Sequence, residues 1–248
     1  MTGATLFDKL CAHMATTPKS VETMFSAGVH FGLGRSRRHP SIKPYIFGTK
    51  NQTDIFDLEK TIKLLDAAKA FVANLGKESK TILFVGGKKE ASAAVKAGAQ
   101  SIGMPHVEGR WIGGTITNFV QTRKRIERYE KLIADKEKGE LAKYTKRERM
   151  LIDKEIASLE KMFFGIVSLK KVPDALFVID PRREKSAIAE AAHGKIPVIA
   201  LAGSDCNING ITHPIAGNDS SKMSIQFFVD EIVKAYQEGK KLGVKQAA

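Results

Sequence analysis

The sequence is short of cysteine, of long apolar runs and of acidic residues, and each shortage excludes a class of protein. Its two cysteines, Cys11 and Cys206, stand nearly the whole chain apart, so they predict reduced thiols rather than a disulfide framework. No apolar run reaches the roughly 18 residues that a membrane-spanning helix needs. The leader contains Asp8 and no arginine, which fits neither a secretory signal nor an arginine-rich presequence. We therefore expect a cytoplasmic protein.

What the chain has in excess is positive charge. Its 248 residues include 40 lysines and arginines against 27 aspartates and glutamates, a formal net charge of +13. An excess of this size is typical of proteins that bind polyanions. An anionic membrane surface would also fit, but no basic amphipathic helix with an aromatic face stands out. The composition therefore favours a nucleic acid over a membrane as the partner.

Residues 109–165 interrupt an alternation of strand-like and helix-like segments. Apolar residues recur there at spacings of three, four and seven on both sides of a polar stretch that contains Gly139. These residues are Phe119, Ile126, Tyr129, Leu132 and Ile133, then Met150, Leu151, Ile156, Leu159 and Met162. Since each stripe is about wide enough to cover its partner, the pattern predicts an inserted antiparallel coiled-coil hairpin over residues 118–163. Ordinary surface helices are the alternative, but a hairpin that projects from a body favours a binding role.

The rest of the chain alternates buried strands with amphipathic helices. Residues 81–85, 173–180 and 196–201 are continuous apolar strands of the doubly buried type. A helix with Asp57 as its N-cap and Gly76 at its end precedes the first, and the last helix is predicted over residues 220–237. The order predicts an α/β body of residues 20–117 plus 164–238, with a three-layer parallel sheet and helices on both faces. Residues 45–47 and 54–57 predict a β-hairpin.

The two ends lie outside the predicted body. In the leader, residues 1–19, the apolar side chains Leu6, Phe7, Leu10, Cys11 and Met14 have helical spacing. Such a segment could be a helix docked on the body, a helix docked on a neighbour, or a flexible segment, and the sequence leaves all three open. Residues 239–248 are predicted to form a C-terminal tail.

Residues 30–40 predict a loop rich in arginine. Arg35, Arg37 and Arg38 stand among glycines and a proline, with Lys43 shortly after. The guanidinium fork matches phosphate oxygens, and glycine lets two backbones come close. A solvated charged face is the alternative, although helices carry such faces more easily than loops. The loop therefore predicts a phosphate-binding surface.

The turn Gly86-Gly87-Lys88-Lys89 after the first buried strand invites a nucleotide-binding interpretation. It lacks the Gly-x4-Gly-Lys-Ser/Thr spacing of a phosphate loop, and no dinucleotide fingerprint follows a strand. An α/β enzyme acting on a phosphorylated or nucleotide substrate is thus the weaker alternative. Lys88 and Lys89 still stand at a predicted helix N-terminus, which favours anions of any kind.

Four polar residues lie at or beyond the predicted carboxyl ends of strands, where α/β folds place their sites. They are Asp180, Asp205, His213 and Asp219. Their spacing matches no metal-ligand motif, and no serine or cysteine stands in a nucleophile elbow. We therefore predict no catalysis, no cofactor and no small-molecule substrate, and the question of a metal ion in this region stays open.

The most distinctive stretch is Gly109-Arg-Trp-Ile-Gly-Gly-Thr115, followed by Thr117-Asn-Phe119. Other segments occur in order around it: Ala27-Gly-Val-His-Phe-Gly32, Pro44-Tyr-Ile-Phe-Gly48 and Gly217-Asn-Asp219. Together they resemble the S2 family of bacterial small-subunit ribosomal proteins.

The resemblance implies a flavodoxin-like body with a protruding coiled-coil hairpin, and a structural role in the small ribosomal subunit. It also implies binding to small-subunit ribosomal RNA and to neighbouring ribosomal proteins, with protein S1 as one candidate. Trp111, Gly113 and Gly114 are expected to anchor the hairpin base. The predicted RNA-binding residues are Arg35, Arg37, Arg38, Lys43, Lys50, Lys88, Lys89, Arg110, Asn118, Arg123, Lys124 and Arg125.

Overall fold

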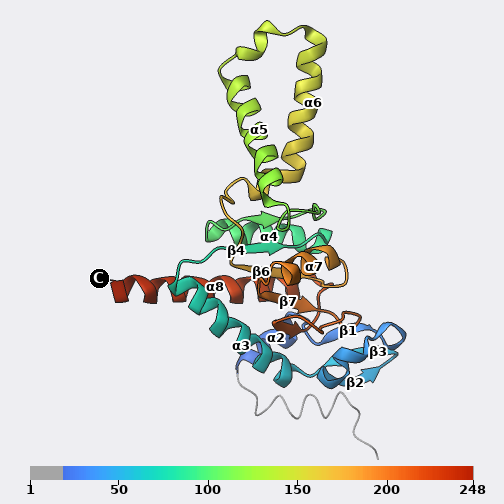
Figure 1. Cartoon of the computed structure of the whole chain (residues 1–248). Helices are drawn as coiled ribbons and strands as arrows, with labels where there is room; N and C mark the ends of the chain where they lie inside the picture. The colour runs from blue at the N-terminus through green and yellow to red at the C-terminus, as the bar shows by residue number, and fades with distance from the viewer. Residues whose placement is uncertain (1–18, 248) are drawn as a thin grey trace, which may run out of the picture.

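The structure, a computed structural model, describes residues 19–247 and is built on a five-stranded parallel sheet (Figure 1). The strand order is β5-β4-β6-β7-β8, and all four neighbouring pairs are parallel. The strands are β4 Ile82–Val85, β5 His106–Val107, β6 Ala175–Ile179, β7 Val198–Ala202 and β8 His213–Ala216. The three buried strands predicted from apolar runs are therefore present, and two short edge strands join them.

Successive side chains of a strand point to opposite faces of the sheet, so each face of the sheet packs against its own hydrophobic core. The helices around the sheet and in the hairpin are α3 Leu58–Lys77, α4 Lys89–Ser101, α5 Phe119–Glu137, α6 Lys146–Phe163, α7 Lys185–His193 and α8 Lys222–Ala247. In β4, Ile82 and Phe84 pack with α3, α4 and α8, whereas Leu83 and Val85 pack with α7 and the base of the hairpin. This confirms a parallel sheet flanked by helices on both faces, an arrangement compatible with the flavodoxin-like fold. The division into domains stays a prediction.

Helices α3 and α8 approach each other closely because both carry glycine at the contact. A Cβ atom on Gly239 would come within 2.8 Å of the backbone of Ala73 in α3, and one on Gly76 would meet the backbone of α8. Gly76 therefore serves packing, whereas its predicted role was to end α3, which stops one residue later. Helix α8 continues past residue 237, where it was predicted to end, so the described residues of the predicted tail belong to α8.

A second, antiparallel sheet lies at the opposite end of the molecule from the hairpin, with the order β1-β3-β2 (Figure 1). Its strands are β1 Phe31–Gly34, β2 Ile46–Lys50 and β3 Thr53–Phe56, next to helix α2 Lys19–Ser26 and the short 3-10 helices η1 Arg35–Arg37 and η2 Pro40–Tyr45. The predicted β-hairpin is confirmed. The predicted loop over residues 30–40 is partly wrong, because β1 and η1 occupy most of it. Two of the four residues of β1 are glycines, so the alternation of apolar and polar side chains that predicts a strand is missing.

The hairpin consists of α5 and α6, joined through Gly139, whose φ of 74° suits glycine, and the 3-10 helix η3 Glu140–Lys143. Its lower half is closed, since Ile126 and Ile156 are buried. Its upper half opens, and Met150 and Leu151 are 51% and 55% exposed (Figure 1). The two helices are confirmed, but packing of the predicted stripes along their whole length is not, and Met162 is exposed as well.

The predictions about the leader and about Cys11 concern residues outside the described range. Cys206 is a free and buried thiol. Within residues 19–247, no helix is both long enough and apolar enough to cross a bilayer.

Candidate nucleic-acid interface

Part of the predicted basic site lies on the small sheet and on the two short 3-10 helices beside it. Arg35 and Arg37 project from η1, which begins where β1 ends, and Lys43 projects from η2; all three side chains are exposed. None of the three forms an ion pair within residues 19–247. Lys50 is exposed at the end of β2, beside a tight turn whose residues have positive φ. The loop therefore presents several cations to solvent together.

Arg38 points the other way, into the protein. Its Nε donates to Asp54 Oδ2 at 2.6 Å, and its Nη2 donates to Asp54 Oδ1 and to Thr49 Oγ1. The side chain of Asp54 is 0% exposed. Hydrogen bonds from Arg38 hold the pKa of Asp54 below its ordinary value. Arg38 thus neutralises a buried carboxylate, so we do not include it among the residues that we propose to bind RNA.

Lys88 is also used internally. It follows β4 at the point where the strand order reverses, which is where open α/β sheets usually hold ligands. Its Nζ lies 2.7 Å from Asp180 Oδ2 and 2.9 Å from Asp219 Oδ2. Burial lowers the pKa of Lys88, but attraction to the two carboxylates outweighs it and raises the pKa above its ordinary value. The ammonium therefore fills the switch point, and of the two predicted lysines only Lys89 is exposed.

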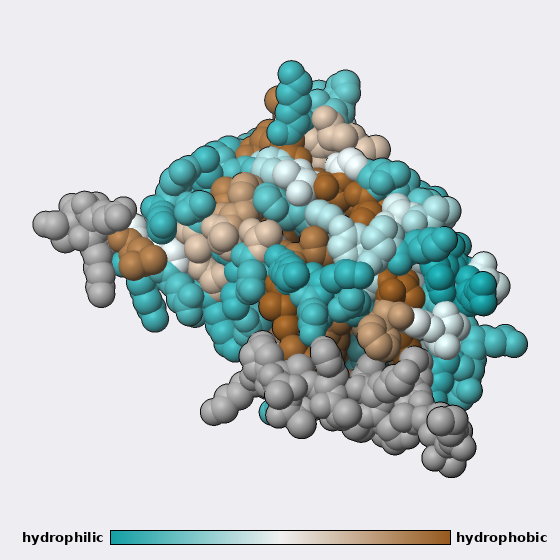
Figure 2. Space-filling view, turned by 90° about the horizontal axis from the view of Figure 1, so that it is seen from below, coloured by the Kyte–Doolittle hydropathy of each residue, from teal (hydrophilic) through white to brown (hydrophobic). Residues whose placement is uncertain are grey.

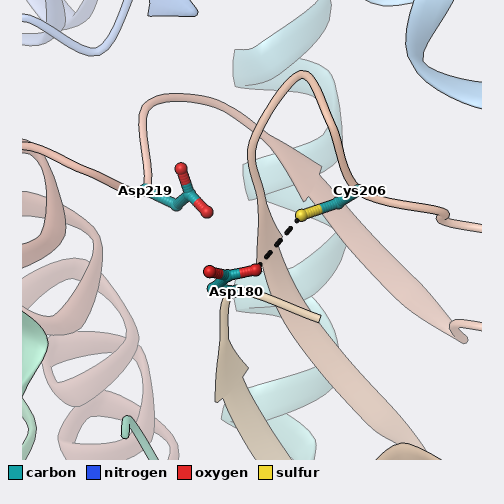
Figure 3. Close-up of side chains that lie close together, drawn as sticks. All are labelled: Asp180, Cys206 and Asp219. Carbon is teal, nitrogen blue, oxygen red and sulfur yellow. Dashed lines mark hydrogen bonds between the residues drawn. The ribbon is translucent and has the colours of Figure 1, made fainter. Parts of the chain in front are cut away.

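The open question of a metal ion concerns the same carboxylates. Ligand atoms of Asp180, Cys206 and Asp219 lie within 4.8 Å of one another (Figure 3). Burial raises the pKa of the Cys206 thiol far above its usual range, so the sulfur stays protonated and donates to Asp180 at 3.5 Å. Lys88 Nζ contacts both Asp180 and Asp219 and already supplies the positive charge that a metal ion would bring. These donors do not fit a metal ion.

Of the remaining two predicted residues, Asp205 adjoins the cluster, where its Oδ1 accepts a hydrogen bond from Cys206 Sγ at 3.6 Å, and His213 lies apart. Asp205 forms an ion pair with Arg182. His213 begins β8 and stacks on Phe71, with ring centroids 4.3 Å apart. Three of the four predicted residues therefore gather around Cys206, and His213 is the exception.

The hairpin base is fastened to α7 by one carboxylate, Glu190. It accepts hydrogen bonds from Trp111 Nε1 and Gly114 N at 2.9 Å, from Ile116 N at 3.0 Å, and from Thr117 N and Oγ1 at 3.3 Å. Burial raises the pKa of Glu190, but these hydrogen bonds together lower it below its ordinary value. Trp111 is 7% exposed and belongs to the core, as predicted. Glu190 itself was missed, because in the sequence it is a single acid in an alanine-rich helix.

The two glycines at this base differ in their roles. Gly114 has a φ of 88°, which disfavours any other residue, and its N–H faces Glu190. A Cβ atom on Gly113 would meet open space. Arg110 and Asn118 flank the loop and are exposed. Only Gly114 is thus required by the backbone.

The predicted cations of α5, like those of the loop, include one that is held by internal contacts and others that are exposed. Arg123 is half-buried and donates to Val167 O at 3.3 Å and to two glutamates of its own helix. Lys124 and Arg125 are exposed and form no ion pair with any described residue. The hairpin base therefore presents Lys124 and Arg125, with Arg110, as a second group of available cations.

Comparisons with known proteins give the family. A family model described as ribosomal protein S2 matches residues 24–239. The chain belongs to the ribosomal protein S2 family. Proteins named small ribosomal subunit protein uS2 are similar to it: that of Coprothermobacter proteolyticus is 38% identical over 89% of this chain and 82% of the relative. That of Sulfurimonas denitrificans is 40% identical over 90% and 86%, and that of Dictyoglomus thermophilum 39% identical over 92% and 92%.

The S2 match runs through the body and the hairpin alike. The S2 family consists of structural proteins rather than enzymes, so the prediction that the chain is not an enzyme is confirmed. The alternative of an enzyme acting on a nucleotide substrate is set aside.

Sequence reasoning missed one part of the basic surface of this S2 chain. A groove of about 1080 Å³ lies between η1 and α7, and its lining includes Arg37, Arg182 and Lys185 together with amide side chains. Lys185 is exposed and Arg182 is paired with Asp205. The signal was a basic run directly after a buried strand, where parallel strands gather their carboxyl ends.

Proposed function

We propose that this S2 chain is a structural component of the small ribosomal subunit in the cytoplasm, where it binds ribosomal RNA and neighbouring ribosomal proteins and supports translation. The relatives named small ribosomal subunit protein uS2 support this place in the ribosome. The net charge of +13 supports a polyanionic partner.

The observation that carries RNA binding is which cations remain available. Exposed cations without a carboxylate partner keep their attraction for phosphates, whereas a paired cation is largely neutralised. We call Arg35, Arg37 and Lys43 the loop surface, and Arg110, Lys124 and Arg125 the hairpin-base surface. Both are exposed, and neither contains an ion pair among the described residues. The loop surface lies beside the small sheet at one end of the molecule, and the hairpin-base surface lies where α5 leaves the body, across the parallel sheet from it (Figure 1). Two separate surfaces suit a protein that contacts two RNA segments.

The salt dependence of binding tests the loop surface. Each phosphate contact releases counterions, so replacing Arg35, Arg37 and Lys43 together with alanine should lower the slope of log affinity against log salt by roughly 2 to 3. The measurement uses small-subunit ribosomal RNA with the neighbouring assembly proteins already bound. The matched control replaces three exposed lysines of α8, Lys222, Lys240 and Lys241, with alanine and keeps the wild-type slope. Equal slopes for both variants would remove the loop surface from the interface.

Sedimentation tests the place in the ribosome separately. Tagged protein in gently lysed cells should travel with small subunits, and protein that stays at the top of the gradient would overturn the proposal. Protein S1 as a neighbour rests on the family resemblance, and loss of S1 from subunits depleted of this protein is its test.

A further inference from the structure

The groove between η1 and α7 has one face of a helix as its floor. Its volume is about 1080 Å³, and four of the residues that line it belong to α7. They are Lys185, Ile188, Ala189 and Ala192, whose spacing of three, four and seven residues puts them on one face of the helix. Ala189 and Ala192 are exposed, and each adds only a methyl group. This face of α7 is therefore flat and apolar, with a cation at its N-terminal end.

The walls of the groove offer mainly hydrogen-bond donors. Among the described residues that line it, Asp205 is the single carboxylate, and it is paired with Arg182. Asn207 Oδ1 already accepts from Asn209 N at 3.0 Å. Within residues 19–247, the NH2 groups of both asparagines have no hydrogen-bond partner. The walls therefore suit a ligand that is rich in acceptors.

Arg37 joins the groove to the loop surface. It projects from η1, belongs to the loop surface and also lines the groove. Lys185, on the α7 side, is exposed and forms no ion pair with any residue that the structure describes. Figure 2 looks at the small-sheet end of the molecule and shows hydrophobic side chains among largely hydrophilic ones, the same mixture that the groove has. An RNA strand held by its phosphates on the loop surface thus lies next to a concave site with further cations.

We infer that this groove holds an unpaired nucleotide of the bound RNA, with its phosphates on Arg37 and Lys185 and its base on the floor formed by α7. The inference rests on the RNA binding proposed above and specifies single-stranded RNA. In single-stranded loops the bases are splayed out, so their faces and edges can enter a groove, whereas a double helix keeps them paired and stacked. Sites for small ligands have volumes of about 300 to 1000 Å³, so the groove has room for roughly one or two nucleotides.

The shape of the groove favours a nucleotide over an acidic protein segment. Protein segments are usually recognised through an apolar anchor in a well-packed pocket or by adding a strand to a sheet edge. The floor formed by α7 offers neither, because it is helical and its side chains are small. A flat base can lie on this floor, and its ring nitrogens and carbonyl oxygens can accept from the NH2 groups of Asn207 and Asn209.

Binding of short RNA by the full-length protein tests the groove. The probes are a labelled single-stranded RNA of mixed sequence and the same sequence as a duplex, followed by fluorescence anisotropy. Ala189→Leu fills the floor and should weaken single-strand binding about ten-fold, because the base loses its contact surface, while duplex binding is unchanged. The matched control Ser186→Leu, at an exposed position of α7 outside the groove, should keep the parent affinity for both probes. Circular dichroism checks that each variant is folded.

A charge variant tests the same site without changing its shape. Lys185→Ala should lower the slope of log affinity for the single strand against log salt by about 0.7, because one phosphate contact is lost. Arg183→Ala removes an exposed cation that does not line the groove, and it should keep the parent slope.

The groove and the loop surface can fail separately. If replacing Arg35, Arg37 and Lys43 lowers the salt slope but Ala189→Leu binds the single strand as the parent does, the groove is refuted and RNA binding by the loop surface stands. Benzoylphenylalanine in place of Ser36, an exposed residue of the groove wall, identifies the occupant in assembled small subunits. Ultraviolet adducts with ribosomal RNA are expected, and adducts with a neighbouring protein in their place would refute the proposal.

Discussion

Glu190 offers the sharpest test of how the hairpin base is held. Replacing Glu190 with alanine removes the acceptor of five hydrogen bonds. The donors on Trp111 and Ile116 belong to buried residues, whereas Thr117 is exposed and can turn to water. A buried donor left without a partner costs about 1 to 3 kcal/mol. Two such donors give a loss of roughly 2 to 6 kcal/mol in the free energy of unfolding.

The substitution Glu190→Gln removes the negative charge of the side chain and keeps its shape. The amide oxygen of glutamine can still accept, but its NH2 group would face N–H donors, so about half of the alanine effect is expected. Urea unfolding followed by the fluorescence of Trp111, the single tryptophan, measures both variants and reports the hairpin base directly. Glu238→Ala, an exposed glutamate of α8, is the matched control and should change stability by less than about 0.5 kcal/mol.

The pKa of Glu190 adds a pH dependence with a definite sign. Its folded pKa is lower than its unfolded value, which lies near 4.5. Its contribution to stability is therefore complete above that pH and is lost as the pH falls through the folded pKa. The difference between the parent and Glu190→Gln should shrink in acid. A Glu190→Ala variant as stable as the parent at pH 7 would refute the hydrogen-bond argument.

Three further predictions concern residues with buried partners or close contacts. Arg38→Ala should destabilise the protein by about 3 to 5 kcal/mol, because it leaves a buried aspartate unpaired, whereas Arg37→Ala should change urea stability by less than about 0.5 kcal/mol. Lys88→Met leaves two carboxylates facing each other, so its thermal stability should fall steeply at pH 7 and recover toward the parent as the pH is lowered and the carboxylates take up protons. Gly239→Ala should cost about 1 to 3 kcal/mol or more in urea unfolding because the new methyl group meets the backbone of α3, whereas Gly113→Ala has open space and should be close to neutral.

Local pattern determined much of this fold before any tertiary contact was known. The apolar runs around Phe84, Phe177 and Ile199 could only be strands covered on both sides, and they form the middle of the sheet. Asp57 caps α3 as expected, accepting from the N–H groups of Glu59 and Lys60. These features depend on neighbours within a few residues, which the sequence displays directly.

Other elements gave no local signal. The edge strands β1, β5 and β8 are short, and they contain glycine or proline or only two residues, so they exist because a neighbouring strand offers hydrogen bonds. The opening of the hairpin toward its tip, where Met150 and Leu151 are exposed, likewise has no local signal. Hydrophobic periodicity and residue propensity predict neither the edge strands nor the opening of the hairpin.

The division of the basic residues into available and occupied ones was decided by tertiary structure alone. Arg37 and Arg38 are adjacent, as are Lys88 and Lys89, and nothing in the sequence separates the members of either pair. Arg38 is neutralised by an aspartate that β3 carries into the core, and Lys88 by carboxylates that follow β6 and β8. Because an ion pair forms only where folding brings the two charges within a few ångströms, the sequence determined how much positive charge the protein has, and the fold determined which of it is left unpaired at the surface.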